Sequence, residues 1–136
     1  MTKKYLDELT YKVIGCCITV HNALGPGLLE SVYHKCLLEE FKYQGIRFSS
    51  ELIVPIEYRN VQLDALLRAD FLVEDCLVIE LKAVEAVLPI HEAQLITYLK
   101  LLDAPKGILV NFNCTNIFHN GQKTYVTEKY KYLDEK

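Results

Sequence analysis

The chain has 136 residues, of which 51% are hydrophobic and 24% charged, values typical of a globular protein whose length fits one domain over residues 1–136. Its formal net charge of −3 excludes attraction of nucleic acid through overall basicity, so such binding would need a local basic patch or metal ions. No apolar run reaches the ~20 residues that cross a bilayer, and residues 1–7 lack the apolar core of a signal peptide, so we expect a cytoplasmic location and no membrane partner.

Two helices are predicted at the start of the chain. Apolar residues recur at helical spacing over residues 5–24, and Gly25-Pro26-Gly27 stops that helix. A second apolar stripe predicts a helix over residues 28–43, which Gln44-Gly45 ends. The chain therefore begins with a helix pair.

Three strands are predicted to follow. Residues 46–58 and 61–73 have strand-like patterns, and a turn near Arg59-Asn60 joins them. The third strand spans about residues 76–83, after a short polar segment at residues 74–76. These segments would be three consecutive strands.

The remaining chain is predicted to hold one more helix and strand. Pro89 opens a helix that ends before Pro105, and residues 106–112 form a buried strand. Asn120-Gly121 predicts a closing hairpin with a type I′ turn. The charged tail from residue 128 onward is expected to be solvated.

Three charged side chains, Asp70, Glu80 and Lys82, lie within these apolar strands. Because strand side chains alternate between faces, Glu80 and Lys82 point the same way. If residues 74–76 form a three-residue loop, antiparallel pairing places Asp70 directly opposite Glu80. Like charges in that arrangement destabilise a sheet, so a cation must compensate them, either Lys82 or a divalent metal ion.

These residues resemble the core motif of the PD-(D/E)XK nuclease superfamily, with Ala69 where its name implies a proline. The string Gly27-x-x-Glu30-x-x-Tyr33 resembles the signature of its GxxExxY branch, a group of small single-domain proteins. The resemblance covers about residues 5–126. It implies an α/β restriction-endonuclease-like core, a mixed central sheet flanked by helices, in the order helix, helix, three strands, helix, strand and C-terminal hairpin.

The resemblance also implies a metal centre. Asp70 and Glu80 would bind Mg²⁺ or Mn²⁺ as hard oxygen donors, with the Leu81 carbonyl as a third ligand. Glu30 would reach in from its helix, directly or through a water molecule. Its presence has a second explanation, because an acidic side chain is favoured in the first turn of any helix.

Three further residues would complete the implied site. Lys82 would orient the attacking water or stabilise the charge that develops on the phosphate. Gln94 and Tyr98, which are four residues apart on one helix face, would position the water, the lysine or the substrate phosphate. The implied reaction is the hydrolysis of phosphodiester bonds of DNA or RNA.

The sequence leaves alternatives open. A catalytically silent module on the same fold would bind nucleic acid or a protein partner, and Glu80 and Lys82 alone would suit a salt bridge. A homodimer could supply surface that a small nuclease lacks. His21 and His34 fit a helix cap or the surface better than a pair of metal ligands. Five scattered cysteines without a Cys-x-x-Cys pair argue against a zinc ribbon.

Overall fold

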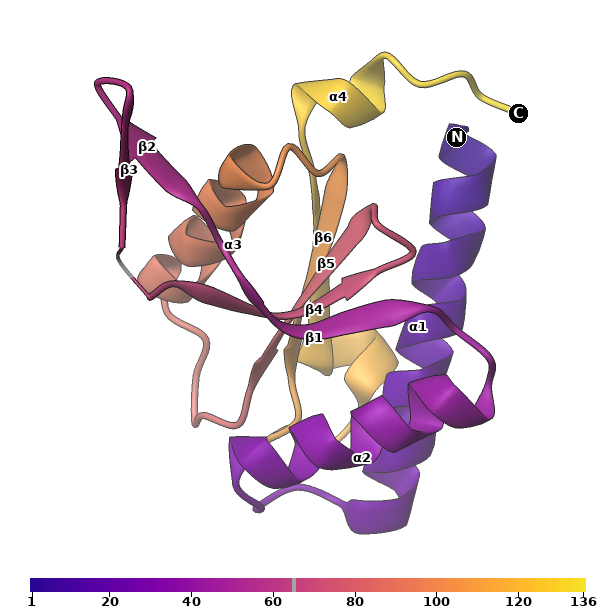
Figure 1. The fold of residues 1–136 in the computed structure, drawn as a ribbon. Coiled ribbons are helices and arrows are strands. Elements are labelled where there is room, and N and C mark those ends of the chain that lie inside the picture. The colour runs from indigo at the N-terminus through magenta and orange to yellow at the C-terminus, as the bar shows by residue number, and fades with distance from the viewer. Residues whose placement is uncertain (65) are drawn as a thin grey trace.

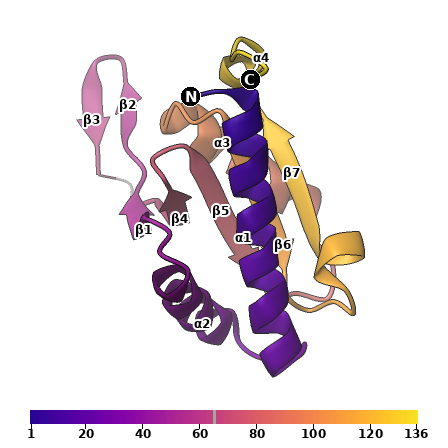
Figure 2. The same cartoon turned by 90° about the vertical axis from the view of Figure 1, so that its right-hand side faces the viewer.

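The computed structural model describes residues 1–64 and 66–136, and helices cover both faces of its main sheet (Figures 1 and 2). No helix in these ranges is long and apolar enough to cross a membrane. The elements, in chain order, are α1 (Lys3–Leu24), α2 (Glu30–Tyr43), β1 (Phe48–Ile53), β2 (Ile56–Tyr58), β3 (Val61–Leu63), β4 (Arg68–Val73), β5 (Leu77–Lys82), α3 (Pro89–Leu101), β6 (Lys106–Asn111), the π-helical turn η1 (Ile117–Gly121), β7 (Gln122–Val126) and α4 (Glu128–Lys131).

The main sheet has five strands in the order β1-β4-β5-β6-β7. Strands β5 and β6 are parallel and α3 connects them, whereas the other neighbouring pairs are antiparallel. A parallel pair needs such a crossover, because a tight turn can join only antiparallel strands. This mixed sheet confirms the predicted α/β class and is consistent with a restriction-endonuclease-like fold.

Each face of the sheet has its own hydrophobic core. On one face α1 and α2 cover Phe71, Ile79 and Ile108, which are fully buried. On the other face Leu95 and Leu99 of α3 pack with a smaller apolar group of the sheet. The two cores fix the positions of β4 and β5 and place helices on both faces of these strands.

The two long strands predicted over 46–58 and 61–73 are each interrupted. The turn at Arg59 and Asn60 is confirmed, and both residues have positive φ angles of 50° and 65°. Pro55, which has no N–H to donate to a ladder, lies between β1 and β2, and β3 ends at Leu63, before β4 begins at Arg68. Residue 65, within the second predicted strand, lies outside the described residues. The β2–β3 pair therefore forms a separate small sheet that projects away from the main sheet (Figures 1 and 2).

The predicted type I′ turn at Asn120-Gly121 is wrong. A C-terminal hairpin exists, but β6 and β7 form it, and the long connection between them contains η1. The Asn116 side chain accepts a hydrogen bond from the His119 N–H, and the Asn120 side chain accepts one from the Asn116 N–H. These local bonds favour a helical turn over a two-residue hairpin.

The tail from residue 128 is solvated as predicted, since none of residues 128–136 is buried, but it also has regular structure. Residues 128–131 form the short helix α4, and the Lys3 N–H donates a hydrogen bond of 2.7 Å to the Asp134 carbonyl. The Tyr130 hydroxyl donates to the Asp7 carboxylate, which also pairs with Lys106 at 2.9 Å. The two ends of the chain therefore lie side by side (Figures 1 and 2).

Gly107 permits the close contact of α3 with β6. A Cβ atom at this position would lie 2.9 Å from Leu99 Cδ2, 3.0 Å from Leu95 Cδ1 and 3.3 Å from the Val78 carbonyl oxygen. We expect Gly107→Val to lower the free energy of unfolding in urea by about 1–3 kcal/mol through overpacking. Gly15→Ala in α1, where no atom lies within 4 Å of an added Cβ, should instead raise it by about 0.5–1 kcal/mol. Equal stability of Gly107→Val and the unmodified protein would contradict this packing.

Candidate functional site

The hairpin β4–β5 brings Asp70 and Glu80 together. Its register pairs Val73 with Leu77 and Phe71 with Ile79, so residues 74–76 form the predicted three-residue loop. The same register places Asp70 opposite Glu80. Strand pairing, set by the length of one loop, thus confirms that the two carboxylates are neighbours.

Side chains replace the backbone ladder at the point where the two strands separate. The Asp70 N–H donates to Glu80 Oε1 at 3.1 Å, and the Leu81 N–H donates to Asp70 Oδ2 at 2.7 Å. Each carboxylate therefore accepts a hydrogen bond from the backbone of the other strand. These bonds fix both side chains at the edge of the ladder.

Burial next to Asp70 makes the charge on Glu80 costly. Glu80 is 5% exposed. Burial raises the pKa of its carboxyl well above the usual range, and the charge and side-chain hydrogen bond of Asp70 raise it further. The Asp70 N–H and the Lys82 charge offset part of this shift. Glu80 consequently keeps its proton unless a cation lies beside it.

Lys82, Gln94 and Tyr98 lie together on the α3 side of the sheet. They line a hollow of about 410 Å³ with His91. Within the described residues, Lys82 forms no ion pair at contact distance, so the salt bridge considered for Glu80 and Lys82 is not formed. The Lys82 charge instead lowers the pKa of Glu80 without direct contact.

Tyr98 is 5% exposed and belongs to the α3 core. Burial raises the pKa of its hydroxyl, and the charges of Glu80 and Asp70 raise it further. A core tyrosine with its hydroxyl near two carboxylates can both pack the helix and face the site. Tyr98 is thus a core residue that also borders the hollow beside Lys82.

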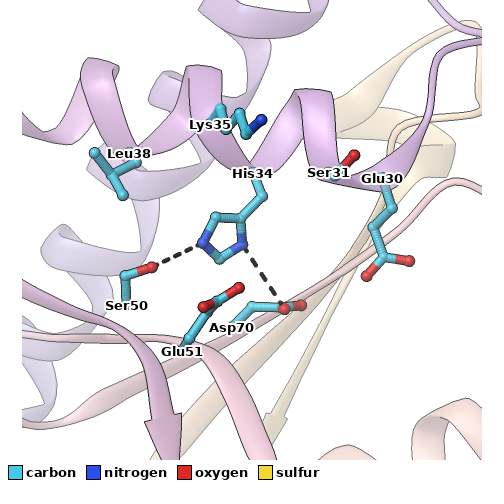
Figure 3. Close-up of a pocket in the computed structure, with 8 residues that line it drawn as sticks. All are labelled: Glu30, Ser31, His34, Lys35, Leu38, Ser50, Glu51 and Asp70. Atoms are coloured by element: carbon cyan, nitrogen blue, oxygen red, sulfur yellow. Dashed lines mark hydrogen bonds and ion pairs between the residues drawn. The ribbon is translucent and has the colours of Figure 1, made fainter.

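Glu30 lies on the other side of Asp70, at the start of α2. It is exposed and lines a cavity of about 510 Å³ with Asp70, His34 and Glu51 (Figure 3). Burial and the Asp70 charge raise the pKa of Glu30, whereas the charges of Lys82, His34 and His91 lower it. Glu30 is therefore within electrostatic reach of both hollows.

His34 is a residue of this site that sequence reasoning missed, because it was expected at a cap or on the surface. Its side chain is only 14% exposed, and Nε2 lies 2.8 Å from Ser50 Oγ (Figure 3). Its ring stacks on Phe71 with centroids 4.3 Å apart. The spacing of four residues from Glu30, which places both on one helix face, was the available signal.

Tyr33 anchors the loop that precedes Glu30. Its buried hydroxyl donates to the Gly25 carbonyl at 2.6 Å and accepts from the Leu28 N–H at 3.2 Å, while its ring stacks on Phe112. We expect Tyr33→Phe to keep the stacking and to lower the free energy of unfolding in urea by about 1–2 kcal/mol, because two backbone groups lose their partner. A variant as stable as the original protein would contradict this anchoring role.

The donor atoms of the site fit a hard divalent cation. Asp70 and Glu80 are oxygen donors held side by side, and their mutual repulsion is the kind that a cation relieves. Among the described residues, no three His, Cys, Asp or Glu side chains are gathered closely enough to hold a metal ion. Of the three carboxylates predicted to bind the metal, Asp70 and Glu80 are therefore in contact, and Glu30 lies farther away.

Comparison with known proteins agrees with this architecture. The family model described as PD-(D/E)XK nuclease superfamily matches residues 7–124. Comparisons with curated proteins and with solved structures gave no match. The matched segment contains both strands of the carboxylate pair and the helices on either side of it. The chain belongs to the PD-(D/E)XK nuclease superfamily.

Proposed function

We propose that this protein is a metal-dependent nuclease that hydrolyses phosphodiester bonds of DNA or RNA. The observation that carries the proposal is the buried Glu80 beside the half-buried Asp70 at the end of the β4–β5 ladder. A stable fold has little reason to bury one carboxylate beside a second, half-buried one, because their repulsion weakens it. A cation-binding role accounts for that cost.

Asp70 and Glu80 would hold Mg²⁺ or Mn²⁺, and Glu30 would add a ligand from α2, directly or through water. When bound, such an ion polarises a phosphodiester and lowers the pKa of a water molecule. Asp70 is fixed for this role by the Leu81 N–H, and Glu80 by the Asp70 N–H. The backbone therefore orients both carboxylates before any ion arrives.

Lys82, Gln94 and Tyr98 would serve the substrate from the α3 side. Their hollow is open enough to admit a phosphate group. The Lys82 ammonium, free of an ion pair at contact distance within the described chain, is available to stabilise the charge on phosphoryl oxygens. Gln94 and Tyr98 would hold the phosphate or the attacking water by hydrogen bonds.

Within the superfamily, we propose that the chain belongs to the GxxExxY branch. The support is the string from Gly27 through Glu30 to Tyr33, whose parts have separate places in the structure. Gly27 has a positive φ of 97° in the loop, Tyr33 ties that loop down, and Glu30 borders the cavity beside Asp70. The string thus contains two residues that shape the loop and one carboxylate that borders the cavity.

Cleavage of single-stranded and double-stranded DNA and RNA tests the proposed function. We expect cleavage with Mn²⁺ or Mg²⁺, none with a chelator, and a loss of at least about 100-fold in Asp70→Asn. Asp75→Asn, which removes an exposed carboxylate from the β4–β5 loop, is the matched control and should cleave normally. A nucleic acid that binds equally well to Asp70→Asn and is never cleaved would instead identify a catalytically silent module.

A further inference from the structure

We infer that His34 supplies a nitrogen ligand to the cation bound at Asp70, so that the centre prefers Mn²⁺ or another first-row transition metal to Mg²⁺. This inference rests on the proposed metal-dependent function and goes beyond it. The ligand set implied by the sequence contains oxygen atoms alone. Imidazole nitrogen suits transition metals, whereas Mg²⁺ prefers oxygen. A histidine ligand would therefore change the metal preference of the centre.

The distance between His34 and Asp70 is unusual for a direct contact. Nδ1 of His34 lies 3.8 Å from Asp70 Oδ1, which is too long for a hydrogen bond (Figure 3). Two atoms that each lie about 2.1 Å from one ion are about 3.0–3.4 Å apart. A closing movement of about 0.4–0.8 Å would therefore bring both atoms to bonding distance of a shared ion.

The orientation of the ring also suits a ligand. Metal-binding histidines commonly donate their other N–H to a neighbouring oxygen, which fixes the tautomer. Ser50 Oγ, 2.8 Å from Nε2, is such an oxygen, and a neutral ring that donates to it presents the Nδ1 lone pair to Asp70. Stacking on Phe71 at 4.3 Å and 16° holds the ring plane. The ring is thus oriented from two sides.

The Asp70 carboxylate leaves one oxygen free for this purpose. Oδ2 accepts the Leu81 N–H, whereas Oδ1 faces His34. Glu30, one helical turn before His34, lines the same cavity and would supply a third donor after a change of rotamer. The other histidine near the site differs, because His91 Nδ1 already accepts the Leu88 N–H at the start of α3.

Electron spin-echo spectroscopy of Mn²⁺ bound to the full chain tests this ligand directly, because it detects a coordinated ¹⁴N nucleus without any activity assay. We expect nitrogen coupling that changes when histidine is labelled with ¹⁵N. The coupling should vanish in His34→Gln and persist in His91→Asn. Mn²⁺ affinity should fall at least about tenfold in His34→Gln, and Mg²⁺ affinity less.

Two results would overturn the inference in different ways. Bound Mn²⁺ without histidine nitrogen coupling would show that His34 lies beside Asp70 without binding the ion. The proposed nuclease function would still stand. Absence of Mn²⁺ binding would overturn the inference together with the proposed function. Ser50→Ala keeps the imidazole and its contact with Phe71, so it separates loss of the ligand from loss of the fold. We expect this variant to retain the nitrogen coupling with weaker binding.

Discussion

Lys82→Ala is expected to lower the cleavage rate by at least about 100-fold while Mn²⁺ affinity stays the same or increases slightly. The lysine forms no ion pair at contact distance in the described chain, so its removal leaves the hydrogen bonds of Asp70 and Glu80 in place. Its positive charge lowers the pKa of Glu80, and loss of that charge should favour a bound cation. Binding and catalysis are thereby separated in a single variant.

Cleavage assays and calorimetric titration with Mn²⁺, both on the same preparations, measure the two effects of Lys82→Ala. Lys100→Ala removes an exposed lysine from α3 and serves as the matched control, with neither effect expected. Normal cleavage by Lys82→Ala would remove the lysine from the proposed chemistry. Loss of both binding and cleavage would mean that Lys82 holds the carboxylates in place.

Glu80→Gln is expected to stabilise the metal-free protein at pH 7 by at least about 1.4 kcal/mol, the equivalent of one pKa unit. The folded state raises the pKa of Glu80 above its ordinary value of 4.5, chiefly through burial and Asp70. Between that ordinary value and the raised one, the unfolded chain loses a proton that the folded chain keeps. The free energy of unfolding therefore falls as the pH rises through this window.

Urea denaturation with a chelator, at several pH values from 4.5 upward, measures this effect. The slope of stability against pH should be smaller in Glu80→Gln than in the original protein. Glu57→Gln on β2, which replaces an exposed glutamate, should leave the slope unchanged. A steep slope that persists in Glu80→Gln would show that another group causes it.

Local sequence rules predicted the centre of the site because they act over short distances. The two-residue strand period and the length of one loop determine that Asp70 and Glu80 are neighbours. The helical spacing of Gln94 and Tyr98 places both beside the sheet, although Tyr98 is also a core residue. In each case, residues of a single hairpin or a single helix determine which side chains lie next to each other.

Features that depend on tertiary placement were not predicted. His34 joins the site because α2 packs on the sheet, where Phe71 of β4 and Ser50 of β1 contact its ring. The Asn-Gly pair suggested a hairpin, but the side chains of Asn116 and Asn120 close a helical turn instead. Contacts between elements, and competition between local hydrogen bonds, decided these outcomes.

The most direct measurement of the central claim is anomalous scattering from a crystal soaked in Mn²⁺. The proposed function predicts a strong peak within bonding distance of carboxylate oxygens of both Asp70 and Glu80. Such a peak would show that the two neighbouring carboxylates bind a cation. A well-diffracting crystal in saturating Mn²⁺ with no peak at this pair would contradict the claim and identify Glu80 as a protonated neighbour of Asp70 without a metal.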